Sequence, residues 1–271
     1  MESYKNREIK KLDIEEVHFY LLGIAKEFDR ICTKHNIPYY MIGGTMLGAI
    51  RHKGFIPWDD DMDFGVPIEY FKELTMVLEK ELSYPYHCCT CYNHPAVLFN
   101  FHKIEDHSTF IKSEAVKLPP EQQIGLNIDV FPLCKCKLND KDWNKISFGN
   151  LLLGGFETSV SHPRSLPRKI VKFFFRQLSG GKHENVNRRI ERILVKDRQG
   201  DCLGNLMGRW GKEKEIMPIE WFGQGKRYAF ENGSFMGPEK YNEYLTHVYG
   251  DYMKLPPEDK RLPHVENIYL R

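Results

Sequence analysis

Two aspartates separated by one residue, Asp61 and Asp63, offer the clearest chemistry in this sequence. In an extended chain, residues two apart project from the same face, so the two carboxylates would lie together while Met62 and Phe64 point into the core. Adjacent carboxylates repel each other at neutral pH unless a cation joins them. Such oxygen ligands suit Mg²⁺, with Mn²⁺ as an alternative, especially where a substrate phosphate completes the coordination. We therefore predict a divalent metal site at Asp61 and Asp63.

Asp129 is the candidate third carboxylate. It lies in the segment 126–131, which alternates strictly between apolar and polar residues and is therefore typical of a strand. Asp129 could be a further metal ligand, or the general base that takes a proton from an acceptor hydroxyl. The preceding Asp59 and Asp60 fit a loop end as well as they fit the site. The predicted catalytic residues are Asp61, Asp63 and Asp129.

A glycine pair precedes these acids. Gly43 and Gly44 lie between an apolar run and a short helical segment, so their amides could approach a phosphate at a helix N-terminus. Basic side chains one helical turn later could donate charge-assisted hydrogen bonds. Lys103 falls near a predicted strand end and is either a phosphate contact or a solvated lysine. The predicted phosphate contacts are Gly43, Gly44, Thr45, Arg51, His52 and Lys103.

Regular elements must position these residues. Asp13 and Glu16 form a capping-box pattern, and apolar residues at steps of three and four over 14–31 predict a helix that ends before Pro38. The further elements expected are strands over 39–42, 97–104, 109–112, 126–131 and 226–232, and helices over 46–51 with Thr45 as N-cap, from Pro67 and from Pro238. The pattern predicts an α+β fold in a single domain, 1–271, with a mainly helical insertion at about 139–215.

The composition limits the function classes. The chain has 271 residues, a formal net charge of +2 and a hydrophobic fraction of 41%. Near-neutrality argues against a nucleic-acid partner, and the apolar content excludes wholesale disorder. No apolar run is long enough to predict a membrane span, and the charged N-terminal segment lacks the apolar core of a secretory signal. The seven cysteines, an odd number, are consistent with reduced thiols in the cytoplasm.

The segment 161–200 carries eleven Lys or Arg against three Asp or Glu, a net charge of +8. This band indicates either one anionic partner or a solvated helical face. Within it, residues 168–178 interleave basic and aromatic side chains. They could make a peripheral contact with the inner face of an anionic membrane, or they could pack as a core-facing helix.

Two sets of residues have weaker claims to function. The cysteines at 88, 89, 91, 134 and 136 lack the paired C-x₂-C spacing of structural zinc sites, which favours ordinary thiols over zinc. Aromatic residues late in the chain could form a cation–π cage for a quaternary ammonium head group, or could belong to the core. These aromatic residues are Trp210, Trp221, Phe222 and Tyr228.

Three segments match a known pattern: YYMIGGTMLGAIRHKGFIPWDDDMDFGVP at 39–67, GLNIDVFPL at 125–133 and YNEYLTHVYGDYMKLPPEDKR at 241–261. They resemble the LicD-type phosphotransferase family, relatives of fukutin and fukutin-related protein within the nucleotidyltransferase superfamily. The resemblance brackets roughly residues 37–264, and the region 135–215 carries little of it.

The resemblance implies a polymerase-β-like nucleotidyltransferase fold, a mixed sheet flanked by helices. It also implies transfer of a substituted phosphate, such as phosphocholine, from a CDP-linked donor to a hydroxyl of a saccharide or lipid-linked cell-surface glycan, with release of CMP. The family pattern places metal ligands at Asp61 and Asp63 and makes Asp129 the third acid. Choline, ethanolamine, glycerol and ribitol remain open as head groups. Alternatives are a nucleotidylyltransferase acting on a small alcohol or antibiotic, and a non-catalytic glycan- or nucleotide-binding protein.

Overall fold

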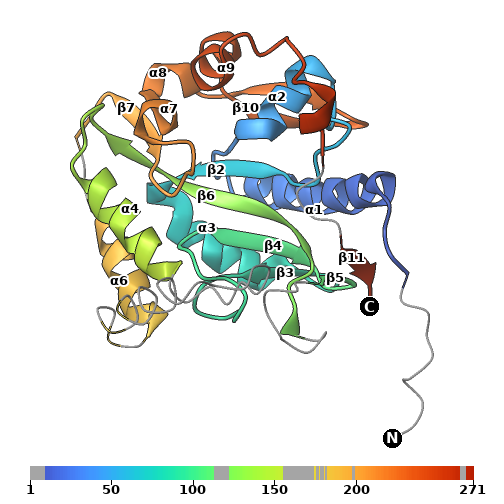
Figure 1. The fold of residues 1–271 in the computed structure, drawn as a ribbon, viewed down its shortest axis with the longest axis horizontal. Helices are drawn as coiled ribbons and strands as arrows, with labels where there is room; N and C mark the ends of the chain where they lie inside the picture. Colours follow the sequence, from blue (N-terminus) through green and yellow to red (C-terminus); the bar gives the residue numbers. More distant parts are fainter. Residues whose placement is uncertain are drawn as a thin grey trace, which may run out of the picture.

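A mixed β-sheet forms the centre of the computed structural model (Figure 1). The structure describes residues 10–112, 122–154, 182–196, 199–262 and 267–271, with the single positions 174, 177 and 180. The strand order is β1 (Tyr40–Met41), β2 (Asp63–Pro67), β6 (Leu126–Cys136), β4 (His102–Asp106) and β3 (Tyr86–Cys89). In this order β2 and β6 are parallel, and the other neighbours are antiparallel. The predicted α+β class with a mixed sheet and flanking helices is confirmed.

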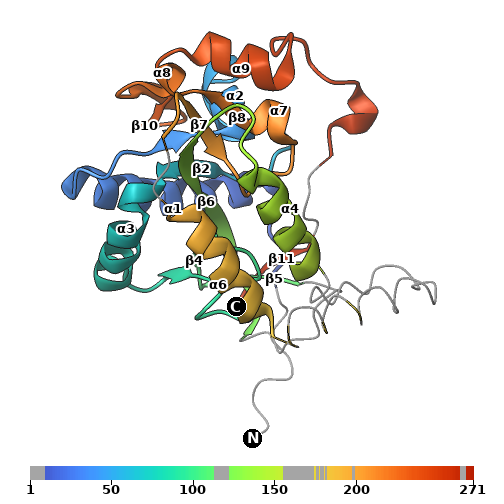
Figure 2. The same ribbon diagram turned by 90° about the vertical axis from the view of Figure 1, so that its left-hand side faces the viewer.

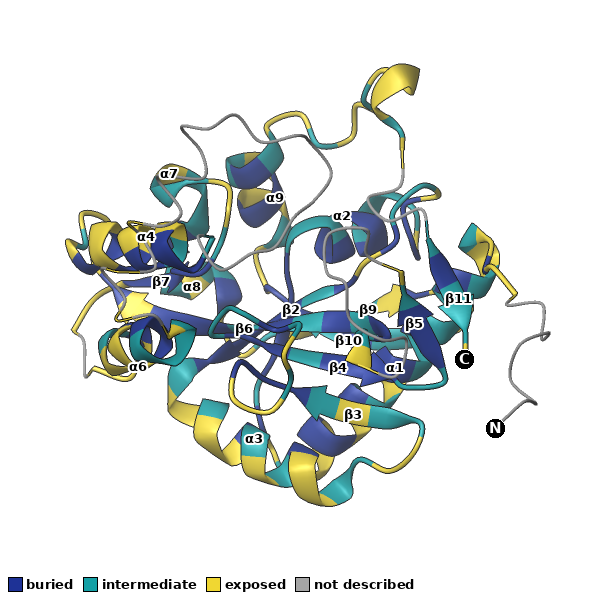
Figure 3. Ribbon diagram, turned by 60° about the horizontal axis from the view of Figure 1, so that its bottom comes forward, coloured by how far each residue is buried: buried dark blue, intermediate teal, exposed yellow. Residues whose placement is uncertain are grey.

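Two helices cover one face of the sheet. α1 (Ile14–Lys34) packs on β4 and β6, and α3 (Ile68–Glu81) packs on β2, β3 and β6. The predicted capping box is present, since the Glu16 N–H donates to the Asp13 carboxylate at 2.9 Å. Figure 3 shows α3 with buried residues on its inner side and exposed residues on its outer side.

Side chains alternate between the two faces along β2 and β6. Phe64, Ile128 and Val130 are fully buried on the helix-covered face, and the Phe64 ring lies 5.1 Å from that of Phe28 in α1. Burying such a side chain stabilises the fold by about 2 kcal/mol. Because the apolar set must face the helices, Asp63 and Asp129 project from the opposite face, as the alternation predicted.

The helix after β1 begins earlier than predicted. α2 spans Gly43–Arg51 with Ile42 as its N-cap, so the expected N-cap, Thr45, is already inside the helix. Gly43 has a φ of +54°, a conformation that glycine adopts readily and that turns the chain directly from β1 into α2. The Thr45 hydroxyl instead accepts a 2.7 Å hydrogen bond from the Asp63 N–H. The prediction of Thr45 as an N-cap was wrong.

A second apolar cluster extends the sheet beyond the acids. β7 (Cys202–Asn205) pairs with the far half of β6, and α4 (Asp142–Leu153) packs on α6 (His183–Leu194) beside it. Both helices fall within the predicted insertion, although β7 in the same range belongs to the sheet. Residues 155–173 lie outside the described residues, as does most of 168–178. The mainly helical insertion and the membrane contact therefore stay predictions.

The C-terminal part of the chain returns to the N-terminal elements (Figure 2). Its elements are α7 (Lys212–Glu215), β8 (Ile216–Pro218), α8 (Ile219–Phe222), β9 (Lys226–Phe230), β10 (Gly233–Gly237), α9 (Tyr241–Tyr249) and η2 (Glu258–Lys260). β10 packs on β1 and α9 packs on α2. Segments about 200 residues apart therefore meet beside the glycine pair.

The strands over 109–112 and 226–232 are confirmed as β5 (Thr109–Ile111) and β9, and β5 pairs with β11 (Ile268–Leu270). The strand expected over 97–104 was partly wrong, because only the part from His102 onward is extended in β4. The Asn187 amide of α6 donates to the Leu98 carbonyl at 3.1 Å, so this segment is held by a helix and not by a strand. No helix in the described part of the chain is long and apolar enough to cross a membrane.

Candidate active site

Three predicted site residues form one row across the sheet. Asp63 of β2 lies opposite Asp129 of β6, and Asp129 lies opposite Lys103 of β4. Residues in register on neighbouring strands have Cβ atoms about 4.5–5.5 Å apart, so their side chains interact directly. The sheet register therefore brings Asp63, Asp129 and Lys103 together, although they are far apart in the sequence.

The acids raise each other's electrostatic energy. Burial, followed by the charges of Asp61 and Asp129, raises the pKa of the Asp63 carboxyl well above its usual range. Asp59 contributes in the same direction, and the Lys103 ammonium opposes the shift. A divalent cation would relieve this repulsion, and carboxylates are the ligands that Mg²⁺ and Mn²⁺ accept. The residues present therefore fit a hard divalent ion held by Asp61 and Asp63, with Asp129 as the neighbouring third acid.

Lys103 is paired rather than solvated. Its ammonium contacts Asp129 Oδ1, donates to Asn127 Oδ1 at 3.0 Å and lies 5.3 Å from the Phe101 ring centroid. Its side chain is only 23% exposed. The interpretation of Lys103 as a solvated lysine was therefore wrong. A lysine in this position neutralises part of the acid charge and can also meet a phosphate that enters beside Asp129.

The glycine pair is more crowded than the sequence indicated. The Gly43 N–H donates to the Tyr244 hydroxyl at 2.9 Å. A Cβ at Gly44 would lie 2.8 Å from Asp59 Oδ2, so the Asp59 carboxylate sits against the start of α2. Asp59 therefore belongs to the site. A phosphate at Gly43, Gly44 and Thr45 stays a prediction, and it requires that Asp59 moves aside or shares a cation with the phosphate.

Tyrosines of α9 complete this wall of the site. A Cβ at Gly43 would lie 3.4 Å from Asp63 Oδ2 and 3.9 Å from the Tyr249 hydroxyl. Burial and then the neighbouring Tyr244, Asp63 and Asp59 raise the pKa of Tyr249. Both tyrosines lie in the matching C-terminal segment 241–261, but neither was predicted as a site residue. Of the two, the helical spacing after Pro238 included Tyr244 and did not include Tyr249.

Arg51 and His52 lie at the C-terminal end of α2, as its last residue and its C-cap. The Arg51 guanidinium donates to the Tyr252 carbonyl and to the His52 ring, both at 2.9 Å. Burial lowers the pKa of Arg51, and the nearby charge of Arg261 lowers it further. The Arg261 guanidinium lies 5.4 Å from the centroid of the Trp58 ring. Arg261, which sequence reasoning did not single out, therefore lies beside Trp58 and Arg51 at this end of α2.

The proposed aromatic cage is not assembled from the expected rings. Trp210 packs edge-on against Tyr249 with centroids 5.8 Å apart. Trp221 instead contacts His247, and Tyr228 contacts Tyr241. Phe222 is buried in the core. Two members of the predicted set contact the tyrosines beside the acids: Trp210 contacts Tyr249, and the buried Phe222 contacts Tyr244 with centroids 5.9 Å apart. The Lys214 ammonium lies 5.3 Å from the Trp210 ring centroid.

The cysteines considered for zinc are in separate places. Cys134 and Cys136 are buried in the second apolar cluster with α4 and α6. Cys89 and Cys91 pack around Val97 at the other end of the sheet, and Cys88 packs against the main core. A zinc site shared by both groups is excluded by this separation.

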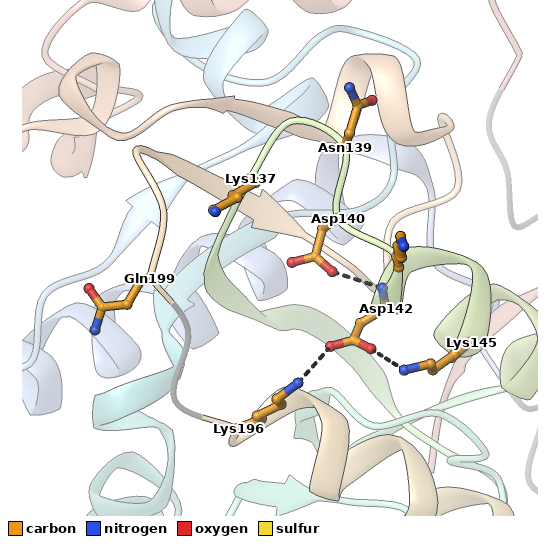
Figure 4. A pocket seen from close by; sticks show the side chains of 8 residues that line it. Lys137, Asn139, Asp140, Asp142, Lys145, Lys196 and Gln199 are labelled. Atoms are coloured by element: carbon orange, nitrogen blue, oxygen red, sulfur yellow. Dashed lines mark hydrogen bonds and ion pairs between the residues drawn. The ribbon is translucent and has the colours of Figure 1, made fainter.

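A hollow of about 450 Å³ lies at the far end of β6 (Figure 4). It is lined by Lys137, Asn139, Asp140, Lys141, Asp142, Lys145, Lys196 and Gln199. Two of its lysines pair with Asp142, Lys145 at 2.7 Å and Lys196 at 3.8 Å. Asp129 and Cys136 are seven residues apart on β6, or about 23 Å at the usual rise of a strand. The hollow is therefore separate from the acids.

Sequence comparisons agree with the site. A family model described as LicD/FKTN/FKRP, nucleotidyltransferase domain, matches residues 36–90, which include Asp61 and Asp63. A relative from Haemophilus influenzae, lipopolysaccharide cholinephosphotransferase LicD, is 31% identical over 277 residues, covering 97% of this chain and 100% of the relative. The chain belongs to the LicD family. The predicted family is confirmed.

More distant similarities are shorter or weaker. Human ribitol 5-phosphate transferase FKRP is 34% identical over 56 residues, which cover 21% of this LicD-family chain and 10% of FKRP. The solution structure of the antibiotic-resistance factor ANT(2'')-Ia aligns with 67% of this chain and 92% of its own at 13% identity. Its TM-score is 0.25, which is too low to support an argument about the fold.

Proposed function

We propose that this LicD-family protein is a metal-dependent transferase that moves a substituted phosphate from a CDP-linked donor to a hydroxyl of a cell-surface glycan and releases CMP. The observation that carries the proposal is the alignment over almost the whole of both chains with a relative named as a lipopolysaccharide cholinephosphotransferase. The shorter similarity to a ribitol 5-phosphate transferase supports the same general chemistry with another head group.

The transfer makes and breaks one bond at phosphorus. The acceptor oxygen bonds to the phosphorus that bears the head group, and the bond from that phosphorus to the bridging oxygen breaks, so CMP leaves. The acceptor proton passes to a base or to water. When bound at Asp61 and Asp63, Mg²⁺ or Mn²⁺ supplies positive charge for the diphosphate oxygens.

We assign separate roles to the side chains beside the proposed ion. Lys103 occupies Oδ1 of Asp129 and leaves Oδ2 for the acceptor hydroxyl or for the ion. The Lys103 ammonium also limits the repulsion between Asp129 and an incoming phosphate. Tyr244 and Tyr249 bury one side of the acid cluster, which strengthens every charge interaction there. Arg51, whose guanidinium also interacts electrostatically with Tyr249 and Asp59, is the basic residue that we expect to meet the nucleotide phosphate.

A donor screen tests this proposal. The full-length protein is incubated with Mg²⁺ and CDP-choline, CDP-ethanolamine, CDP-glycerol or CDP-ribitol, and CMP and pyrophosphate are both quantified, with EDTA as the control. We expect metal-dependent CMP release from one donor and no pyrophosphate. Pyrophosphate release from a nucleoside triphosphate would support a nucleotidylyltransferase instead. Thermal stabilisation by a nucleotide without either product would support a non-catalytic binding protein.

The head group can be tested at Trp210, because this ring lies on Tyr249 beside the acids. If the donor is CDP-choline, Trp210→Ala should raise its KM about tenfold, the loss expected for one cation–π contact of about 1–2 kcal/mol. Trp221→Ala is the matched control, because that ring contacts His247 instead. An equal effect of the two variants would contradict a role of Trp210 in head-group binding.

A further inference from the structure

A second set of metal-binding side chains lies at the β3 edge of the sheet. Cys89, His94 and Glu105 have ligand atoms within 4.8 Å of one another, and so do His87, Glu105 and His107. Glu105 is common to both sets. We infer that the first set, Cys89, His94 and Glu105, forms a zinc site, with His107, which pairs with Glu105 and is less exposed than His87, as the fourth ligand. This site is distinct from the predicted site of the hard divalent ion.

The sheet register explains why these residues meet. His87 of β3 lies opposite Glu105 of β4, and Cys89 lies opposite Lys103. Residues two apart on a strand share a face. Cys89 and Glu105 therefore project from the same face as Lys103, while the turn after β3 brings His94 back over them. Cys88, one residue earlier, points to the other face and packs against the main core.

Glu105 is a buried carboxylate, and a buried negative charge requires a compensating partner. Its side chain is 3% exposed. One carboxylate oxygen accepts a hydrogen bond from the Gly125 N–H, and the other lies 3.2 Å from His107 Nδ1. Among the described residues, its ion-pair partner is the His107 ring. Buried carboxylates in proteins are paired with a cation or bind a metal, so Glu105 is suited as a ligand at the centre of the two sets.

The distances suit a tetrahedral ion. Two ligand atoms bound at about 2.0–2.1 Å to tetrahedral zinc are about 3.3 Å apart, close to the 3.2 Å between His107 Nδ1 and Glu105 Oε1. The ligand atoms of Cys89, His94 and Glu105 lie within 4.8 Å of one another, and His107 would join them by rotating about its side chain while it stays against Glu105. His94 Nδ1 accepts a hydrogen bond from the Ala96 N–H at 3.2 Å, which a metal at this nitrogen would replace.

The ligand types select the metal. A thiolate with two imidazoles and one carboxylate favours zinc over Mg²⁺, which prefers oxygen ligands alone. The four protein ligands leave no open position, as in structural zinc sites. The ion would fasten the segment 90–101 to β3 and β4. This segment also contacts α6, where Asn100 donates to Asn187 at 2.8 Å. Zinc would thereby steady the β4 strand that carries Lys103.

Metal analysis of the untagged full-length protein tests the site. Protein purified without chelator should contain about one equivalent of zinc by elemental analysis. After exchange into Co²⁺, it should show a thiolate-to-cobalt charge-transfer band in the near ultraviolet. Cys89→Ser should abolish the band, and Cys88→Ser, the matched control on the other face, should keep it. Folding of each variant is checked by circular dichroism and size exclusion.

Further variants keep the test decisive. If Cys89→Ser fails to fold, the more exposed His94→Gln should lower zinc affinity and shift the cobalt spectrum. Asp61→Asn should leave the zinc content and the cobalt band unchanged, which separates this site from the proposed catalytic ion. A protein with less than about one tenth of an equivalent of zinc and no cobalt–thiolate band would overturn the inference. A band that survives Cys89→Ser would do the same.

Discussion

The two faces of the central sheet differ in how their polar groups are compensated. On the face covered by α1 and α3, His102 packs on Phe71, and its ring nitrogen lies 2.7 Å from the Thr75 hydroxyl. On the opposite face, Asp63 is surrounded by like charges that raise its pKa, with Lys103 as the compensating cation. One face is arranged for stability, while the other keeps repulsion that a bound cation would relieve. This contrast is expected where a binding site is maintained at a cost in stability.

The largest effect should follow loss of the acids. Asp61→Asn and Asp63→Asn should each lower kcat/KM for CMP release at least about 10³-fold, roughly 4 kcal/mol, because the ion loses a charged ligand. Glu73→Gln is the matched control, because it neutralises an exposed carboxylate of α3 behind the covered face. Steady-state CMP assays at saturating Mg²⁺ measure both. A rate near that of the wild type in either aspartate variant would remove these residues from the site.

Much of this contrast could be predicted from the sequence. The alternation over 126–131 and around Asp61 and Asp63 assigned each residue to a face, because apolar side chains at every second position must turn to the core. The structure confirms this assignment for Phe64, Ile128 and Val130, which are fully buried, and for Asp63 and Asp129 on the other face. It was wrong for Asp61, because β2 begins at Asp63 and Asp61 is an exposed residue ahead of the strand. The resemblance of three segments to the LicD family located the same acids independently.

The rest depends on contacts that no local pattern contains. The pairing of Lys103 with Asp129 is set by the register of β4 on β6, which the sequence of β4 alone does not fix. Tyr244 and Tyr249 reach the site from about 200 residues away in the chain. Thr45 was misjudged because the N-cap rule considers residue type, whereas the turn at Gly43 begins the helix sooner. Cys89 was considered with other cysteines, although its partners in the structure are histidines and a glutamate.

The covered face should respond to acid. Burial lowers the pKa of His102 to about 4, whereas an unfolded histidine titrates near 6.5. Between these values the unfolded chain binds the proton and the folded protein does not, so stability falls as the pH falls through this window. The loss between pH 7.5 and 5 should be about 2 kcal/mol.

Urea unfolding of the wild type and His102→Gln at several pH values checks this expectation. The variant should be less stable at pH 7.5, and its stability should depend less on pH between 7.5 and 5. Parallel pH profiles for the two proteins would show that His102 is not the group responsible.

Loss of the lysine should cost less than loss of the acids. Lys103→Gln removes the cation that compensates Asp129, and we expect a loss in kcat/KM of about 10- to 100-fold, the value of a charge-assisted hydrogen bond. Lys72→Gln, an exposed position on α3, is the control. In Lys103→Gln/Asp129→Asn the two losses should not add, because each removes the same contact. Additive losses would place the two residues in separate roles.

The smallest expected effect is on the free energy of unfolding. Its pH dependence at Asp63 is opposite to that at His102 on the covered face. The raised pKa of Asp63 means that the folded protein binds the proton more tightly than the unfolded chain. Below about pH 4 this carboxyl therefore does not lower the free energy of unfolding. The free energy of unfolding falls as the pH rises through the folded-state pKa of Asp63. In EDTA at pH 8, Asp63→Asn should raise the free energy of unfolding, because it removes a charge that the folded protein disfavours. Saturating Mg²⁺ should reverse the order, since the wild type alone keeps the charged ligand. A variant that is less stable than the wild type in EDTA would mean that the Asp63 charge is already compensated without a metal, and the contrast between the two faces would then disappear.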